Sequence, residues 1–177
     1  MPDVTTLFNG RFLRIVKQGT WEYAERQKVT GVVAIVPVTD DGEFLFVEQM
    51  RIPVGKRVIE FPAGLAGDVA GAESEPLLEA ARRELLEETG YSGGQWSELE
   101  TCPTSSGLTS ETVTFFRAVG LQQTGTGEGD GHEQITLHRV PVSEVDAWLG
   151  RMSANGFLIA ALVHAGLYLA GFARSID

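Results

Sequence analysis

The most constraining feature of the sequence is a short acidic segment within residues 81–91. It reads Ala-Arg-Arg-Glu-Leu-Leu-Glu-Glu-Thr-Gly-Tyr, so that Glu84, Glu87 and Glu88 lie close together. Positions i, i+3 and i+4 share one face of an α-helix, and the pattern therefore places these carboxylates side by side. Their repulsion would destabilise an isolated helix unless a cation or an arginine such as Arg83 offset it. Clustered carboxylate oxygens suit Mg²⁺ or Mn²⁺, whereas zinc prefers Cys and His.

An ordinary solvated acidic face would give a similar local pattern. The flanking residues favour a more specific interpretation, because Glu75 precedes Arg83 by eight positions and Gly90 ends the segment. The full pattern is Glu75, seven residues, Arg83-Glu84-Leu85, one residue, Glu87-Glu88, one residue, Gly90-Tyr91. It resembles the signature of the Nudix hydrolases, which cleave nucleoside diphosphates linked to another group.

The glycine that opens this signature stands at an unusual distance. The family usually has five residues between that glycine and the first glutamate, whereas ten residues separate Gly64 from Glu75. Gly67 or Gly71 could serve instead. We favour Gly64 followed by an enlarged loop, because the preceding residues 60–63, Glu-Phe-Pro-Ala, also resemble the family.

Composition restricts the partners of the chain. Its 177 residues, 43% of them hydrophobic, fit one domain with a full core. The net charge of −10 argues against binding to nucleic acid or an anionic membrane. Cys102 is the only cysteine, which excludes an intrachain disulfide, and no secretion signal is evident at the N-terminus. We therefore expect a cytoplasmic protein whose partner is a small molecule.

The hydrophobic pattern predicts interleaved strands and helices. Strands are expected at residues 11–17, 20–28, 31–39, 43–50, 95–102, 112–120 and 134–142. Helices are expected from Ser74 to Thr89, over 143–149 and over the apolar segment Phe157–Ala173, and residues 122–133 read as a mobile loop. Phe157–Ala173 is at the short limit for a membrane span, and a packed helix is the better interpretation.

This interleaving favours helices packed on mixed sheets, an α/β (α+β) fold. The family resemblance implies the same, namely the Nudix α/β/α sandwich with mixed sheets. An N-terminal β-hairpin extension would occupy residues 1–30 and serve dimerisation and base stacking, and the hydrolase domain would span residues 31–177.

Further segments resemble one branch of the family, the ADP-ribose and nucleotide-sugar pyrophosphatases. They are residues 47–51, 55–56, 60–65, 105–111 and 133–135. The resemblance implies that two or three Mg²⁺ or Mn²⁺ ions bind the carbonyl of Ala63 and the carboxylates of Glu84, Glu87, Glu88 and Glu133. The implied catalytic residues are Glu87, Glu88 and Glu133, and the implied substrate-binding residues are Trp21, Arg51, Glu60, Gly64, Ser105 and Glu111.

The resemblance also bears on Arg83, on the general base and on the aromatic residues of the N-terminal hairpin. Arg83 resembles the family arginine that orients the glutamates, a structural task. The general base would be an acidic residue in the 122–133 loop, with Glu133, Asp130 and Glu128 all open. Trp21 and Tyr23 have two possible roles. In a homodimer, they would reach the partner subunit and stack on an adenine there, as N-terminal aromatic residues do in relatives; otherwise they would pack in the core.

The resemblance predicts metal-dependent hydrolysis of the diphosphate linkage of ADP-ribose or a related nucleoside diphosphate sugar, giving a nucleoside monophosphate and a sugar phosphate. GDP-mannose, flavin dinucleotide and coenzyme A are alternative substrates. A catalytically silent, ligand-sensing Nudix module is the alternative from another class, and the presence of all the helix carboxylates argues against it.

Overall fold

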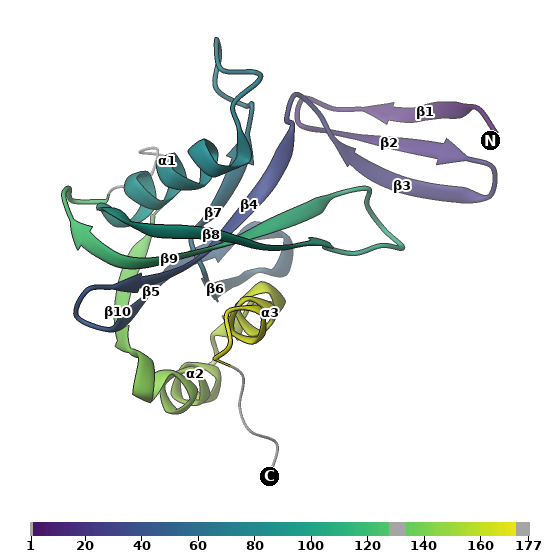
Figure 1. Cartoon of the computed structure of the whole chain (residues 1–177). Helices are drawn as coiled ribbons and strands as arrows, with labels where there is room; N and C mark the ends of the chain where they lie inside the picture. The colour runs from purple at the N-terminus through teal and green to yellow at the C-terminus, as the bar shows by residue number, and fades with distance from the viewer. Residues whose placement is uncertain (1, 128–133, 173–177) are drawn as a thin grey trace.

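The computed structural model describes residues 2–127 and 134–172. They form a central mixed sheet with helices on both sides and a smaller sheet at the N-terminus (Figure 1). The small sheet has the order β1-β2-β3, made of β1 (Val4–Asn9), β2 (Leu13–Gln18) and β3 (Trp21–Arg26), all antiparallel. The hairpin of β2 and β3 was predicted; β1 was not, because exposed residues throughout the strand leave no alternation to detect.

The central sheet has the strand order β11-β6-β5-β4-β9-β8. Its strands are β4 (Gly31–Thr39), β5 (Glu43–Arg51), β6 (Lys56–Glu60), β8 (Tyr91–Pro103), β9 (Thr112–Gln123) and β11 (Leu158–Ile159). β10 (Thr136–Pro141) pairs with β5, and β7 (Ala63–Ala66) pairs with β4. The sheet is mixed because β4 runs parallel to β9 and antiparallel to β5.

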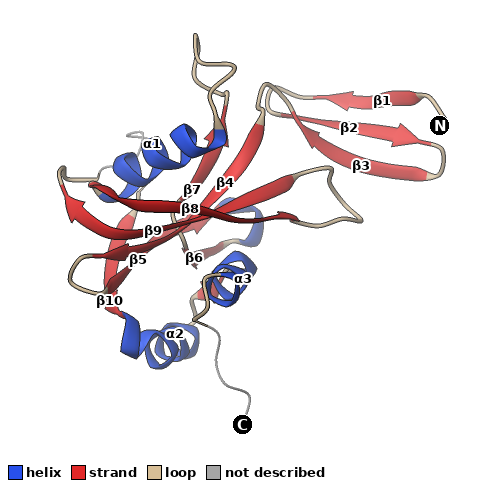
Figure 2. Ribbon diagram, in the orientation of Figure 1, coloured by secondary structure: helices blue, strands red, loops and turns tan. Residues whose placement is uncertain are grey.

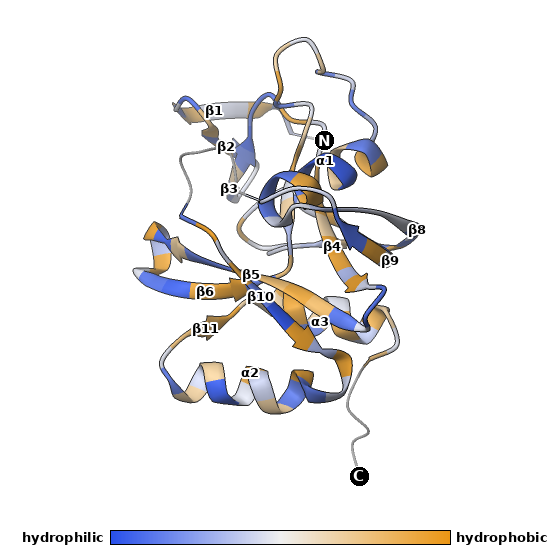
Figure 3. Cartoon of the chain, turned by 90° about the vertical axis from the view of Figure 1, so that its left-hand side faces the viewer, coloured by the Kyte–Doolittle hydropathy of each residue, from blue (hydrophilic) through white to orange (hydrophobic). Residues whose placement is uncertain are grey.

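Helices cover the two faces of this sheet, so the predicted α/β/α sandwich with mixed sheets is confirmed (Figure 2). α1 (Leu77–Thr89) lies on one face, and α2 (Val145–Ala154) and α3 (Ala161–Leu169) lie on the other; short 3₁₀ turns occupy Ile52–Val54 and Val142–Glu144. Alternation along β5 explains the layers, since Leu45 packs in the cluster under α1 while Phe44 and Phe46 pack in the cluster under α2 and α3. Hydrophobic segments accordingly gather in the central strands (Figure 3).

The helix that carries the acidic segment begins later than predicted. α1 starts at Leu77 and not at Ser74, with Pro76 in an extended conformation at its N-terminal cap. Proline disfavours the helical conformation of the residue before it, so Glu75 cannot belong to the helix. The predicted end was correct, because Gly90 adopts the left-handed conformation at φ 75° that closes the helix.

The prediction of one long C-terminal helix over Phe157–Ala173 was wrong. Leu158 and Ile159 instead form β11, which runs parallel to β6 and provides partners for the backbone groups at that edge of β6. The helix α3 is confined to Ala161–Leu169. None of the helices in the described part of the chain has the length and apolar character needed to span a bilayer. Cys102 is half-buried, and the cytoplasmic location inferred from it stays a prediction.

Candidate active site

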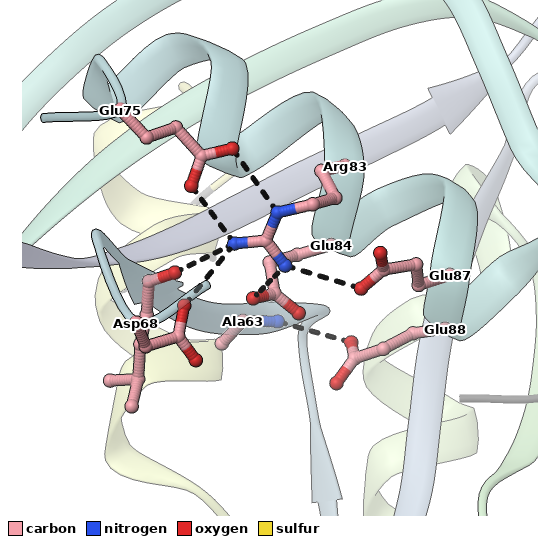
Figure 4. Close-up of polar contacts among 8 residues, drawn as sticks. Ala63, Asp68, Glu75, Arg83, Glu84, Glu87 and Glu88 are labelled. Carbon is pink, nitrogen blue, oxygen red and sulfur yellow. Dashed lines mark hydrogen bonds and ion pairs between the residues drawn. The ribbon is translucent and has the colours of Figure 1, made fainter. Parts of the chain in front are cut away.

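The acidic face of α1 meets the β7 segment, as the sequence pattern implies. Ala81 and Leu85 are fully buried and fix the opposite side of the helix against the core. Glu84 and Glu88 consequently face the Ala63–Ala66 strand, whereas Glu87 is more exposed (Figure 4). The acidic face of α1, defined here as Glu84, Glu87 and Glu88, is therefore part of a structured contact.

Arg83 organises this face. Its Nε and Nη2 each donate to the carboxylate of Glu75 at 3.1 Å, and Nη2 also donates to the carbonyl of Leu65 at 2.8 Å. Its Nη1 donates to Glu84 at 2.8 Å and to Glu87 at 3.2 Å. Hydrogen bonding to Glu75 is the largest cause that raises the pKa of Arg83, so the guanidinium stays charged. These contacts support the orienting role implied for this residue.

Glu84 is a largely buried contact of Arg83. Its side chain is 14% exposed and lies against Gly64, where an added Cβ would come 1.9 Å from the Glu84 carboxyl carbon. Burial raises the pKa of Glu84 to about 7, and although Arg83 acts to lower it, Glu87 and Asp68 raise it further. A bound cation would favour the ionised carboxylate.

Glu88 and Glu87 complete the acidic face. Glu88 is buried, and its carboxylate accepts a hydrogen bond from the backbone N–H of Ala63 at 3.2 Å. The structure thus brings Ala63 to Glu88 through its N–H, and a metal-binding role for the Ala63 carbonyl stays a prediction. The side chain of Glu87 is more open, at 44% exposure, and can turn toward a ligand.

The chemistry of these residues fits a divalent cation. Among residues 2–127 and 134–172, no three Asp, Glu, His or Cys side chains are gathered closely enough to form a ready-made metal site. The donors that are present are oxygens alone, which hard cations prefer. A cation would also relieve the repulsion among the three glutamates, which Arg83 offsets in part through Glu84 and Glu87.

The proposed general bases fall on a segment that is not described. Glu133, Asp130 and Glu128, as well as His132, lie outside the described residues. The last described residue before them, Gly127, packs on the C-terminal end of α1, and an added Cβ there would come 2.3 Å from the carbonyl carbon of Thr89. The last described residue before the gap is therefore next to the helix that carries Glu87 and Glu88.

Arg51 and Glu60 are brought together on neighbouring strands. The Nε of Arg51 donates to Glu60 at 2.7 Å between β5 and β6. The side chain of Arg51 is 40% exposed while that of Glu60 is 19% exposed, so the arginine reaches outward from a fixed carboxylate. The structure thus pairs these two residues, and the binding of a substrate phosphate by Arg51 stays a prediction.

Ser105 and Glu111 lie at the β8–β9 connection, which contacts the small sheet. Glu111 pairs with Arg26 of β3 at 2.7 Å, and the backbone N–H of Ala24 donates to the carbonyl of Leu108 at 2.9 Å. The carbonyl of Ser105 accepts the N–H of Leu108 at 2.9 Å within the turn. In this structure Glu111 thus tethers the connection, a contact that sequence analysis missed because 85 positions separate the partners.

Trp21 lies in a surface pocket rather than in the core. It is 62% exposed, which excludes the core-packing alternative, and it lines a cavity of about 290 Å³. The other lining residues are Gln18, Tyr23, Ser106, Gly107, Thr109 and Ser110. Trp21 belongs to β3 of the small sheet, which stands on the right of Figure 1 while α1 stands on the left, and none of the residues that line the Trp21 pocket belongs to α1.

Two other features do not include the glutamates of the acidic face. His138 contacts Glu48 at 2.7 Å and packs near Trp148 of α2; burial alone would raise the pKa of Glu48, but hydrogen bonds from His138 and Arg57 lower it. A groove of about 570 Å³ between α1 and the start of β8 is lined by Glu75 and Arg83 as well as by Arg82, whose guanidinium lies over the Trp96 ring. That groove is larger than the Trp21 pocket, yet none of Glu84, Glu87 and Glu88 lines it.

Comparison with known proteins decides the family. The model of the NUDIX domain matches residues 28–159. The chain belongs to the NUDIX family. This NUDIX chain is 36% identical over 146 residues to the ADP-ribose pyrophosphatase of Mycobacterium tuberculosis, covering 81% of this chain and 69% of that protein. It is 30% identical over 145 residues to the methanol dehydrogenase activator of Bacillus methanolicus, covering 78% and 76% of the two chains.

A solved structure supports the fold of the NUDIX chain. The crystal structure of an ADP compounds hydrolase superposes with a TM-score of 0.72, covering 95% of this chain and 89% of that one. The sequences are 21% identical, so this likeness concerns the fold alone.

Proposed function

We propose that this NUDIX protein hydrolyses the diphosphate linkage of ADP-ribose or a related nucleoside diphosphate sugar, with Mg²⁺ or Mn²⁺ as cofactor. The observation that carries the proposal is the acidic face of α1, on which Arg83 holds Glu84 and Glu87 while Glu88 reaches Ala63. The name of the relative from Mycobacterium tuberculosis supports ADP-ribose as the substrate. The products would be AMP and ribose 5-phosphate.

The metal ligands and the general base would come from different segments of the chain. Glu84, Glu87 and Glu88, with Ala63 and Glu133 as further ligands, would hold two or three ions. Divalent cations in such a site neutralise the diphosphate and lower the pKa of a bound water. Glu133, or else Asp130 or Glu128, would accept the proton of the attacking water. No covalent intermediate is required, because carboxylates that bind cations serve direct attack by water.

Substrate binding would involve both sheets. Arg51, held by Glu60, presents a guanidinium to the diphosphate or the terminal ribose, and the segment of Gly64 leaves room for Glu84. The pocket at Trp21 offers an exposed indole and the hydroxyl groups of Ser106 and Thr109 to a base. Ser105 and Glu111 support this pocket through the turn and the pair with Arg26.

A homodimer would unite the two parts of the site. The small sheet exposes large apolar side chains on each of its strands and in the β1–β2 turn, namely Val4, Leu7, Phe8, Phe12, Leu13 and Trp21. Exposed apolar surface of this kind marks an interaction site. Residues 1–30 would thus serve as the dimerisation and base-stacking extension, with Trp21 reaching the active site in the hydrolase domain of the partner subunit.

A substrate panel tests the proposal. ADP-ribose should give a higher kcat/KM with Mg²⁺ than ATP, GTP, GDP-mannose, flavin dinucleotide or coenzyme A. A nucleoside triphosphate cleaved more efficiently would contradict the substrate assignment. If the protein bound ADP-ribose but hydrolysed none of the compounds, the result would instead favour the non-catalytic alternative.

A further inference from the structure

The segment that departs from the family signature touches the acidic face of α1. The inserted loop, residues 67–75, projects beyond the N-terminal end of α1 (Figure 1). Its two ends are tied together, because the carboxylate of Glu75 accepts the backbone N–H of Gly67 as well as the hydrogen bonds of Arg83. The loop is therefore attached to the helix that carries the catalytic glutamates.

Asp68 is the second point of attachment. Its Oδ1 lies 3.6 Å from Nη2 of Arg83, and its side chain is 39% exposed (Figure 4). The hydrogen bonds of Arg83 go to the acceptors already described, and 3.6 Å is too long for another one. Asp68 consequently acts on Arg83 through charge. The charge also reaches Glu84, on which Asp68 exerts a repulsive effect.

This position matters because Arg83 and a cation compete for the same oxygens. Nη1 of Arg83 donates to both Glu84 and Glu87, which are proposed metal ligands. A negative charge on the Nη2 side of the guanidinium compensates part of its positive charge. It leaves Glu84 and Glu87 with more negative potential for an incoming cation.

We propose that Asp68, contributed by the inserted loop, is a positioning residue that strengthens divalent-cation binding at the acidic face of α1. The proposal rests on the proposed function, since it takes that face as the metal site. It assigns a role to the very segment in which this chain departs from the family signature.

The test is a direct titration of the chain with Mn²⁺ alone, without substrate, by calorimetry. Asp68→Asn should weaken Mn²⁺ binding about fivefold at low ionic strength, and the difference should shrink as salt screens the charge. Asp68→Glu keeps the charge and should bind Mn²⁺ nearly as the wild type does. Glu73→Gln is the matched control, because Glu73 lies in the same loop, accepts the N–H of Gly71 at 3.0 Å and loses the same charge on substitution.

The outcomes of the Mn²⁺ titrations distinguish failure of the role of Asp68 from failure of the proposed function. Equal Mn²⁺ affinity in Asp68→Asn and Glu73→Gln would overturn the role of Asp68, and so would an Asp68→Glu variant as weak as Asp68→Asn. Similar unfolding temperatures of the cation-free variants, together with weakened binding in Asp68→Asn alone, support it over a purely structural role. A wild-type chain that binds no Mn²⁺ would contradict the proposed function itself.

Discussion

The acidic face of α1 and the small sheet β1–β3 differ in how far one chain completes them. On α1, each glutamate has a partner in the same chain, from Arg83 to the backbone of Ala63. On the small sheet, Phe8, Phe12 and Trp21 are each more than 60% exposed, at 62%, 66% and 62%. The first region is held by intramolecular contacts, whereas the second exposes the kind of surface that another molecule covers.

The difference suggests that chemistry and recognition are divided between the regions. Burial and ion pairs fix the acidic face of α1, so changes there should affect turnover. The exposed pocket of Trp21 lies where β3 contacts the β8–β9 connection through the Ala24–Leu108 hydrogen bond and the Arg26–Glu111 pair. Changes there should affect substrate affinity and association instead.

The strongest way to test this division is Glu88→Gln. Loss of a buried carboxylate that contacts the Ala63 backbone should lower kcat about 100- to 1000-fold, because metal ligands and charge stabilisation contribute on that scale. The control is Glu79→Gln, on the outer side of α1, where Glu79 pairs only with Arg82 in an exposed contact. Wild-type kcat in Glu88→Gln would remove α1 from the mechanism.

A change of packing beside the same face comes next. In Gly64→Ala, the added Cβ would meet Glu84 at 1.9 Å from its carboxyl carbon and displace it. We expect kcat to fall about 100-fold, since misplacement of a catalytic group by about 1 Å has such an effect. Gly150→Ala is the control, as no atom lies within 4 Å of an added Cβ there. Equal kinetics of the two variants would show that Glu84 tolerates displacement.

The small sheet should respond differently. Trp21→Ala should raise KM for ADP-ribose about tenfold and leave kcat nearly unchanged, because stacking stabilises ground and transition states alike. Tyr168→Ala is the control, because Tyr168 is an exposed aromatic residue of α3, at 71% exposure, outside both the small sheet and the pocket lining. An unchanged KM in a Trp21→Ala variant that still forms a dimer would keep the dimer and reject stacking. A fully active monomer by sedimentation would reject both.

The smallest expected effect concerns stability without metal. The pKa of Glu84 in the folded chain is about 7, above the ordinary value of 4.5, so the folded state holds this proton more tightly than the unfolded state. The wild type should therefore lose stability as pH rises from 4.5 to 7, and Glu84→Gln should avoid that loss. At pH 8 we expect the cation-free variant to be more stable by about 1 kcal/mol. Denaturant unfolding that shows the same difference at pH 4 and pH 8 would contradict the burial argument.

Sequence alone predicted the acidic face of α1 because local spacing defines it. The positions of Glu84, Glu87 and Glu88, and the helix end at Gly90, depend only on a 3.6-residue period and a glycine. The interleaving of strands and helices likewise predicted helices packed on mixed sheets, and the family resemblance implied the sandwich.

Long-range contacts could not be predicted in this way. The pair of Arg26 with Glu111 joins distant segments, and the parallel pairing of β11 with β6 replaces what reads as a helix. The approach of Asp68 to Arg83 depends on the path of the inserted loop, for which the family signature offers no guide. Each of these contacts is decided by tertiary packing rather than by local pattern.

Removal and return of the metal tests the central claim most directly. The wild-type chain, freed of cations with a chelator and given ADP-ribose, should show no turnover. Addition of Mg²⁺ should then release AMP and ribose 5-phosphate in equal amounts, as followed by phosphorus NMR. Hydrolysis that continues without a divalent cation, or products other than this pair, would contradict the account.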